Sequence, residues 1–146
     1  MCSLPIMIQT YLNESDPALD VLQQRIFNAG KQEKLLTYTE LVEDVEFNPK
    51  SLGGKYFITE MHPVNVALIG EYLDYISSRS QSRFGFLASA LVVSKIDNVP
   101  GPGFYVLAKE LSLLSKPGKS AQEMFWIGEV QKAYAHYGAT KSYEVI

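Results

Sequence analysis

The stretch Leu36-Thr37-Tyr38-Thr39-Glu40-Leu41 decides the interpretation of the fold. Thr37 and Glu40 have the spacing of a capping box, in which each side chain accepts a hydrogen bond from the backbone amide of the other residue. Leu36 and Leu41 occupy the two positions of a hydrophobic staple, which fixes the direction in which a chain enters a helix. The stretch therefore predicts a short helix that begins at Tyr38 and runs to about residue 46.

Two more helices are predicted on either side of this stretch. Apolar residues at helical spacing predict one over about 17–29, with Asp16 as its N-cap and Gly30 just beyond its end. His62-Pro63 opens the other, because proline suits the first position of a helix, and its apolar stripe extends to about residue 80. The polar and basic residues 77–83 then predict a turn.

The second half of the chain has a different pattern. The β-branched and apolar residues at 86–95 predict a buried strand. Pro100-Gly101-Pro102-Gly103 predicts a stiff loop, which leads into a helix over 104–115. A second capping box at Ser120–Glu123 predicts a last helix, which ends before Gly138.

Together these elements predict an α+β, mainly helical fold. Its winged-helix-like core spans about residues 17–105 and contains a small sheet built around 86–95, and two C-terminal helices follow at about 104–138. The chain has 146 residues, a length at which a domain buries about two-thirds of the surface of its unfolded chain. Residues 1–146 are therefore predicted to form a single domain.

The amino-acid composition limits the classes of protein to which this chain can belong. Apolar residues make up 47% of the chain and charged residues 20%, as in an ordinary globular protein, and no apolar run approaches the ~20 residues of a membrane span. We therefore expect no membrane partner. The single cysteine, Cys2, excludes an internal disulfide and fits a reducing compartment, so a cytoplasmic location is predicted.

The charge is distributed unevenly along the chain. Residues 1–75 contain eleven acidic and five basic residues, whereas residues 76–146 contain five acidic and eight basic ones. A dedicated nucleic-acid-binding protein usually has a basic surplus, because neutralising phosphates supplies most of its non-specific affinity. The acidic first half counts against simple DNA binding, while the basic second half leaves a one-sided contact open.

Four short segments carry a resemblance to a known family. They are Thr37-Tyr38-Thr39-Glu40-Leu41-Val42, Ala67-Leu68-Ile69-Gly70-Glu71-Tyr72-Leu73, Ala88-Ser89-Ala90-Leu91-Val92-Val93 and Gly101-Pro102-Gly103-Phe104. In order and spacing they resemble TYGxIA, RxVGxxL, PCHRVV and the glycine-containing turn of the C-terminal winged-helix domain in O6-alkylguanine-DNA alkyltransferases and alkyltransferase-like proteins. The resemblance covers about residues 17–105. The chain also looks like small uncharacterised bacterial or phage proteins, which suggest no activity.

The departures from the family pattern argue against alkyl transfer. The resemblance places the family's reactive cysteine at Ser89 and its histidine at Ala90, so neither a thiolate nor a base stands there. The arginine that fills the gap left by a flipped nucleotide falls on Ala67. Only Tyr38 matches, at the position where the family's tyrosine helps to rotate the target phosphate.

The leading hypothesis is therefore a non-catalytic binding module that contacts DNA through a winged helix. The helix over about 63–79 is the predicted groove element, and Arg79 and Arg83 would mainly engage phosphates. The predicted DNA-binding residues are Tyr38, Lys50, Lys55, Asn65, Arg79 and Arg83.

Two alternatives remain open. The first is a protein-interaction or inhibitory protein whose acidic residues face a basic partner such as a nucleic-acid-processing protein; these residues are Glu33, Glu40, Glu43, Asp44 and Glu46. The second is an enzyme, the less favoured interpretation, which should show a buried titratable cluster in a pocket. The aromatic C-terminal helix predicts intramolecular packing first and a homodimer surface second. No cofactor and no metal are expected, because His62, His136 and Cys2 lie on three different elements.

Overall fold

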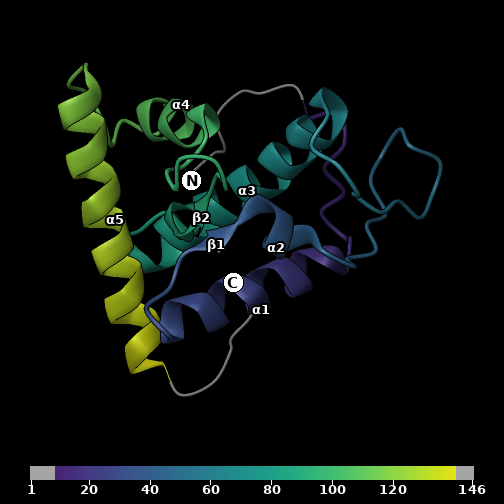
Figure 1. Ribbon diagram of the computed structural model, residues 1–146, viewed down its shortest axis with the longest axis horizontal. Coiled ribbons are helices and arrows are strands. Elements are labelled where there is room, and N and C mark those ends of the chain that lie inside the picture. The colour runs from purple at the N-terminus through teal and green to yellow at the C-terminus, as the bar shows by residue number, and fades with distance from the viewer. Residues whose placement is uncertain (1–8, 141–146) are drawn as a thin grey trace.

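The computed structural model describes residues 9–140, and in that range it is mainly helical with one small sheet (Figure 1). The α+β, mainly helical prediction is therefore confirmed. Cys2 lies outside the described residues. The elements in chain order are α1 (Ala18–Lys31), β1 (Leu36–Thr37), α2 (Tyr38–Val42), α3 (Pro63–Phe84), the 3-10 helix η1 (Ala88–Leu91), β2 (Val92–Val93), α4 (Pro102–Glu110) and α5 (Lys119–Ala139).

The predicted capping box opens α2. The Thr37 hydroxyl accepts from the Glu40 amide at 3.1 Å, and the Glu40 carboxylate accepts from the Thr37 amide at 2.9 Å. The helix ends at Val42 rather than near residue 46, and Asp44 adopts a left-handed conformation with φ of 58°. The local signal therefore fixed the start of α2 but not its end.

The sheet consists of two short parallel strands. Leu36 pairs with Val92 and Thr37 with Val93. The predicted strand over 86–95 is wrong for most of its length, because Ala88–Leu91 forms η1 and only Val92–Val93 joins the sheet. The amides of Ala88 and Ser89 donate to serine hydroxyls of α3, at 2.9 Å each, instead of to a neighbouring strand.

Residues 77–83 form the last turns of α3 and not the predicted turn. The helix continues to Phe84 and ends at Gly85, whose φ of 84° is the left-handed conformation that favours glycine. Ser77 and Ser80 belong to the buried face of the helix, where Ser80 donates to the Phe86 carbonyl at 2.7 Å. The polar pattern of residues 77–83 is also typical of a surface turn. It does not show that the serines hydrogen-bond to buried backbone groups of residues 86–89.

Three predicted helix ends lie inside helices instead. Gly30 belongs to α1, and Gly138 belongs to α5. Ser120 does not cap α5, which begins one residue earlier and follows Gly118 with φ of 99°. Gly30 serves packing, because a Cβ there would lie 3.0 Å from the Cβ of Tyr137, so its absence lets α1 approach α5 closely.

Helix α5 runs along one side of the molecule and contacts α1 and η1 (Figure 1). Its inner face includes Ala133 and Tyr137, and the Tyr137 ring meets Phe27 of α1 edge-on at 5.8 Å between centroids. Further along the helix, the Trp126 indole donates to the Ala90 carbonyl at 2.8 Å. The predicted intramolecular role of this aromatic face is therefore confirmed.

The connection between α2 and α3 differs from that of a helix-turn-helix. Residues 43–62 separate the two helices, whereas the turn of a helix-turn-helix has about three to four residues. Within 9–140 the named strands pair only in parallel, and the antiparallel contact is a single bridge between Phe47 and Tyr56. The winged-helix resemblance stays a prediction, and these two features weigh against it.

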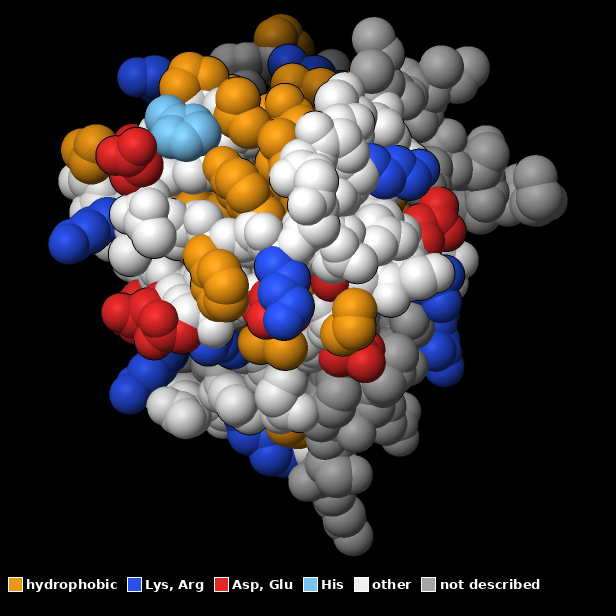
Figure 2. Space-filling view, turned by 90° about the vertical axis from the view of Figure 1, so that its right-hand side faces the viewer, with side chains coloured by type: hydrophobic (Ala, Val, Ile, Leu, Met, Phe, Trp, Pro, Cys, Tyr) orange, Lys and Arg blue, Asp and Glu red, His pale blue; other side chains and the backbone are white. Residues whose placement is uncertain are grey.

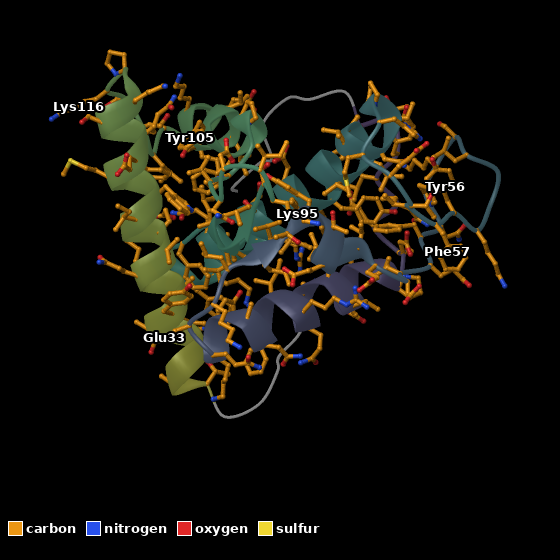
Figure 3. The ribbon with its side chains drawn as sticks, viewed as in Figure 1. Glu33, Tyr56, Phe57, Lys95, Tyr105 and Lys116 are labelled. Atoms are coloured by element: carbon orange, nitrogen blue, oxygen red, sulfur yellow. The ribbon has the colours of Figure 1, made fainter. Side chains whose placement is uncertain are left out.

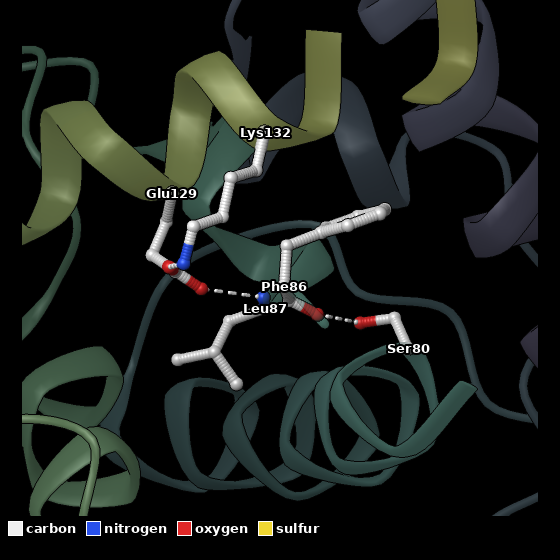
Figure 4. A network of polar contacts seen from close by, with 5 residues as sticks. All are labelled: Ser80, Phe86, Leu87, Glu129 and Lys132. Atoms are coloured by element: carbon white, nitrogen blue, oxygen red, sulfur yellow. Dashed lines mark hydrogen bonds and ion pairs between the residues drawn. The ribbon is translucent and has the colours of Figure 1, made fainter. Parts of the chain in front are cut away.

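A buried carboxylate attaches α5 to the segment that precedes η1. Glu129 accepts from the Leu87 amide at 2.8 Å and pairs with the Lys132 ammonium at 2.9 Å (Figure 4). Beside it, the Phe86 carbonyl accepts from Ser80 of α3. Leu87 is thus bound to α5 and its neighbour Phe86 is bound to α3. The Leu87 amide and the Phe86 carbonyl therefore both have hydrogen-bond partners.

Replacing Glu129 should therefore be costly. We expect Glu129→Ala to lower the free energy of unfolding by about 2–3 kcal/mol, because the buried Leu87 amide loses a charged acceptor. Glu129→Gln retains an acceptor oxygen and should lose clearly less. Urea unfolding of both variants measures the difference, and equal losses would show that the Leu87 contact is not the cause.

Candidate functional site

A mainly apolar pocket of about 510 Å³ lies between α2, α3, η1 and the loop 94–103. Helix α3 supplies one wall with Ile69 and Leu73, and Phe104 at the start of α4 contributes to the lining. The volume is in the range of sites that hold small organic molecules. β1 leads into α2, and β2 leads into the loop 94–103. Because the two strands pair with each other, they bring α2 and the loop close together, and both segments line the pocket.

Tyr38 holds the loop against α2. Its hydroxyl accepts from the Gly101 amide at 2.8 Å, and a Cβ at Gly101 would lie only 3.0 Å from that hydroxyl. Burial raises the pKa of Tyr38, and the Gly101 hydrogen bond opposes this shift only in part. Tyr38 therefore stays protonated at neutral pH, and its hydroxyl keeps a proton that it can donate to a ligand of the pocket that it lines.

Asp74 is the titratable group with the strongest perturbation in the pocket lining. Burial raises its pKa to about 7, and the neighbouring carboxylates of Glu110 and Glu71 add to the effect. Within residues 9–140 the Asp74 carboxyl accepts no hydrogen bond and forms no ion pair. A carboxyl in this state sits near the midpoint of its titration at neutral pH, which is the property expected of a functional group in a cleft.

Ser89 also lines the pocket but is not an activated nucleophile. The Ser77 hydroxyl donates to the Ser89 hydroxyl at 2.6 Å and accepts from the Ser89 amide at 2.9 Å. A serine nucleophile needs a base such as histidine within hydrogen-bond reach. In the described chain the hydroxyl that contacts Ser89 belongs to another serine, and the next residue is Ala90.

The mouth of the pocket is bordered by exposed apolar and charged side chains. Met61, Val66 and Ile96 are exposed there, and Ile96 is 95% exposed. Lys95 and Asp97 of the loop also line the site. Figure 3 shows Lys95 near the middle of the molecule, well separated from Tyr56 and Phe57 on the 43–62 loop.

The predicted DNA-binding residues do not gather at this site, apart from Tyr38. Asn65 is 2% exposed; its amide donates to the Glu60 carbonyl at 2.8 Å and accepts from the Tyr56 hydroxyl at 2.6 Å. Its side chain is therefore committed within the protein, and this burial weighs against the prediction of Asn65 as a DNA contact. The 43–62 loop buries Asn65 by folding back on α3, which helical spacing does not reveal.

The four predicted basic contacts belong to two separate groups. Lys50 and Lys55 lie on the 43–62 loop, whereas Arg79 and Arg83 lie in the last turns of α3, at the other end of that helix (Figure 1). Lys55 is 3.9 Å from Glu46, and Arg79 lies over the Tyr75 ring at 5.4 Å. On the face of the molecule drawn in Figure 2, basic and acidic side chains are interspersed, and hydrophobic side chains gather in the upper part.

The acidic residues predicted to face a basic partner are exposed, but two of them already have roles. Glu40 caps α2, and its pKa is lowered mainly by the Thr37 amide. Glu46 pairs with Lys55. Glu43 and Asp44 remain exposed beyond the end of α2.

Sequence reasoning missed Asp74 and most of the pocket. Gly70 and Asp74 lie one helical turn apart beside the apolar stripe of α3, and this spacing was the one local signal. Across residues 9–140, three or more metal-ligating side chains do not converge anywhere. In the same range no helix combines the length and apolar character that crossing a bilayer requires.

Neutralising Asp74 should stabilise the fold in a pH-dependent manner. Because the pKa of Asp74 is higher in the folded state, the folded protein holds the proton more tightly, and stability falls as pH rises from about 4 to about 7. Asp74→Asn removes this loss. We expect it to raise the free energy of unfolding by about 1–3 kcal/mol at pH 8 and to change it little at pH 4.

Chemical denaturation of the wild type and Asp74→Asn at pH 4, 6 and 8 measures this difference. An advantage of the variant that is the same at all three pH values would contradict the assignment of the raised pKa to Asp74.

Comparison of the chain with protein-family models, with curated proteins and with solved structures finds no match. The geometry and chemistry of the pocket are therefore the ground on which a function can be proposed.

Proposed function

We propose that this chain is a binding module that holds a small organic ligand in the pocket between α2, α3 and the loop 94–103. The observation that carries the proposal is the combination of an apolar pocket of about 510 Å³ with a few convergent polar groups. Such a combination is typical of ligand sites, where apolar walls supply affinity and a few polar atoms fix orientation. Tyr38 and Asp74 are the polar groups with perturbed pKa values.

The arrangement favours binding over catalysis. A general base must lie within hydrogen-bond reach of the proton that it removes, and a nucleophile needs an activating base close to it. In the pocket lining, Ser89 contacts Ser77, and the Tyr38 hydroxyl contacts the Gly101 amide. Burial raises the pKa of Asp74 to about 7, and in the described chain no nucleophile is hydrogen-bonded to its carboxyl.

A pocket-blocking variant tests the proposal. Gly70 lines the site with open space where its Cβ would be, and its φ is an ordinary one, so Gly70→Phe should place a ring in the pocket without breaking α3. Gly138→Phe is a matched control, because Gly138 is exposed on α5 and also has nothing within 4 Å of a Cβ.

We expect fragments from a library screened by NMR to shift the amide signals of residues 38, 70 and 101 in the wild type. Gly70→Phe should weaken binding of those fragments at least tenfold, and Gly138→Phe should leave it unchanged. Binding that persists in Gly70→Phe, with a thermal unfolding midpoint close to that of the wild type, would overturn the proposal.

DNA is a second candidate ligand, and one observation favours it. Tyr38 and Ser89 stand where the resemblance to alkyltransferases places functional groups, and both line the same pocket. A pocket that accepts a flipped base would need such a shape. The charges oppose it, because Asp74 and Asp97 line the pocket with Lys95 as their basic counterpart.

Fluorescence anisotropy distinguishes DNA from a small organic molecule as the ligand. Short duplex and single-stranded DNA are titrated at about 50 and about 200 mM salt. DNA binding through the end of α3 should weaken steeply with salt and about tenfold in Arg79→Glu. Absence of binding at the lower salt concentration would exclude DNA as the ligand.

A further inference from the structure

We infer that the pocket selects organic cations: ligands with an apolar body and a protonated amine that pairs with the Asp74 carboxylate. This inference rests on the proposed function, because it names the chemical class of ligand for the same pocket. It follows from the partners that Asp74 lacks, from the charges around it, and from the walls beside it.

The first step concerns the hydrogen bonds of Asp74. Its carboxyl is partly buried in the wall of the pocket, and the described chain offers it no donor and no cation within ion-pair distance. The buried carboxylates of residues 9–140 have partners within the chain: Asp16 accepts from the amides of Ala18 and Asn48, and Glu129 accepts from the Leu87 amide. Asp74 is different, because its carboxyl is reached by solvent in the pocket and has no partner among residues 9–140, so a ligand that enters the pocket can pair with it.

The second step concerns the electrostatic field at that position. Glu71 lies on the same helix and Glu110 lies on α4, and both carboxylates act on Asp74. Tyr38 of α2 stays neutral, and the loop adds Asp97 and Lys95. The acidic groups outnumber the basic one, so the site attracts a positive ligand and disfavours an anion.

The third step concerns the rest of the ligand. Ile69 and Leu73 of α3 and the Phe104 ring of α4 give the pocket apolar walls, which bind a hydrocarbon or aromatic body. A small inorganic cation would leave these walls empty and would find one free carboxylate instead of several converging ligands. An amine attached to an apolar group uses both parts of the site.

The ligand charge gives the inference a pH signature. An alkylamine stays protonated below about pH 9, whereas the Asp74 carboxyl titrates near neutrality, so binding should follow its ionised fraction. With a pKa of about 7, that fraction falls about tenfold between pH 8 and pH 6. Affinity for an amine should fall by the same factor, while affinity for a neutral analogue should not.

A charge-matched ligand series tests the inference on the full chain. The probes are arylalkyl amines of several sizes, each paired with the alcohol and the carboxylate of the same skeleton, and calorimetric titration measures their affinity at pH 6 and 8. We expect amines to bind at least tenfold more tightly than the alcohols at pH 8 and the carboxylates not to bind. Asp74→Asn should reduce amines to the level of alcohols and abolish the pH dependence.

Two variants make the outcome decisive. Glu43→Gln removes an exposed carboxyl that lies outside the pocket and should leave the preference for amines, whereas Gly70→Phe should abolish binding of every probe. Alcohols that bind the wild type as tightly as amines, or amine binding that survives Asp74→Asn, would overturn the inference and leave the proposed function intact. If no probe of any charge binds and the wider fragment screen also finds no pocket ligand, both are overturned.

Discussion

The hydrogen bond that the Gly101 amide donates to the Tyr38 hydroxyl holds together two segments that line the pocket. It joins the start of α2 to the loop 94–103, and both segments line the pocket together with α3. Pro100 and Pro102 stiffen the loop, while glycine between them lets the backbone approach the tyrosine ring closely. The capping box at Thr37 then fixes the position of Tyr38 at the first turn of the helix.

The protein interior uses a few side chains to satisfy irregular backbone. The hydroxyls of Ser77 and Ser80 accept hydrogen bonds from two amides of η1. The Asp16 carboxylate accepts from two backbone amides, and the Glu129 carboxylate accepts from the Leu87 amide. These contacts replace the ladder of hydrogen bonds that a larger sheet would supply, because the described sheet has only two residues in each strand. A mainly helical core with so little sheet can therefore carry a long irregular connection and a pocket beside it.

Local signals were readable from the sequence, and long-range contacts were not. The capping box at Thr37 and the proline at the start of α3 depend on neighbouring residues, so the sequence predicted both helix starts. The serines of α3 looked like a surface turn because their partners, the amides of η1, are remote in sequence. Asp74 went unnoticed for a similar reason: its environment comes from α4 and the loop, which no helical period shows.

The close approach of α1 to α5 has a consequence for the order in which the chain acquires structure. Gly30 receives Tyr137, a residue made about a hundred positions later. At a synthesis rate of about 5–20 residues per second, the apolar face of α1 waits roughly 5–20 s on the ribosome before its partner helix is complete. During that interval the Gly30 surface of α1 lacks the helix that covers it in the folded chain.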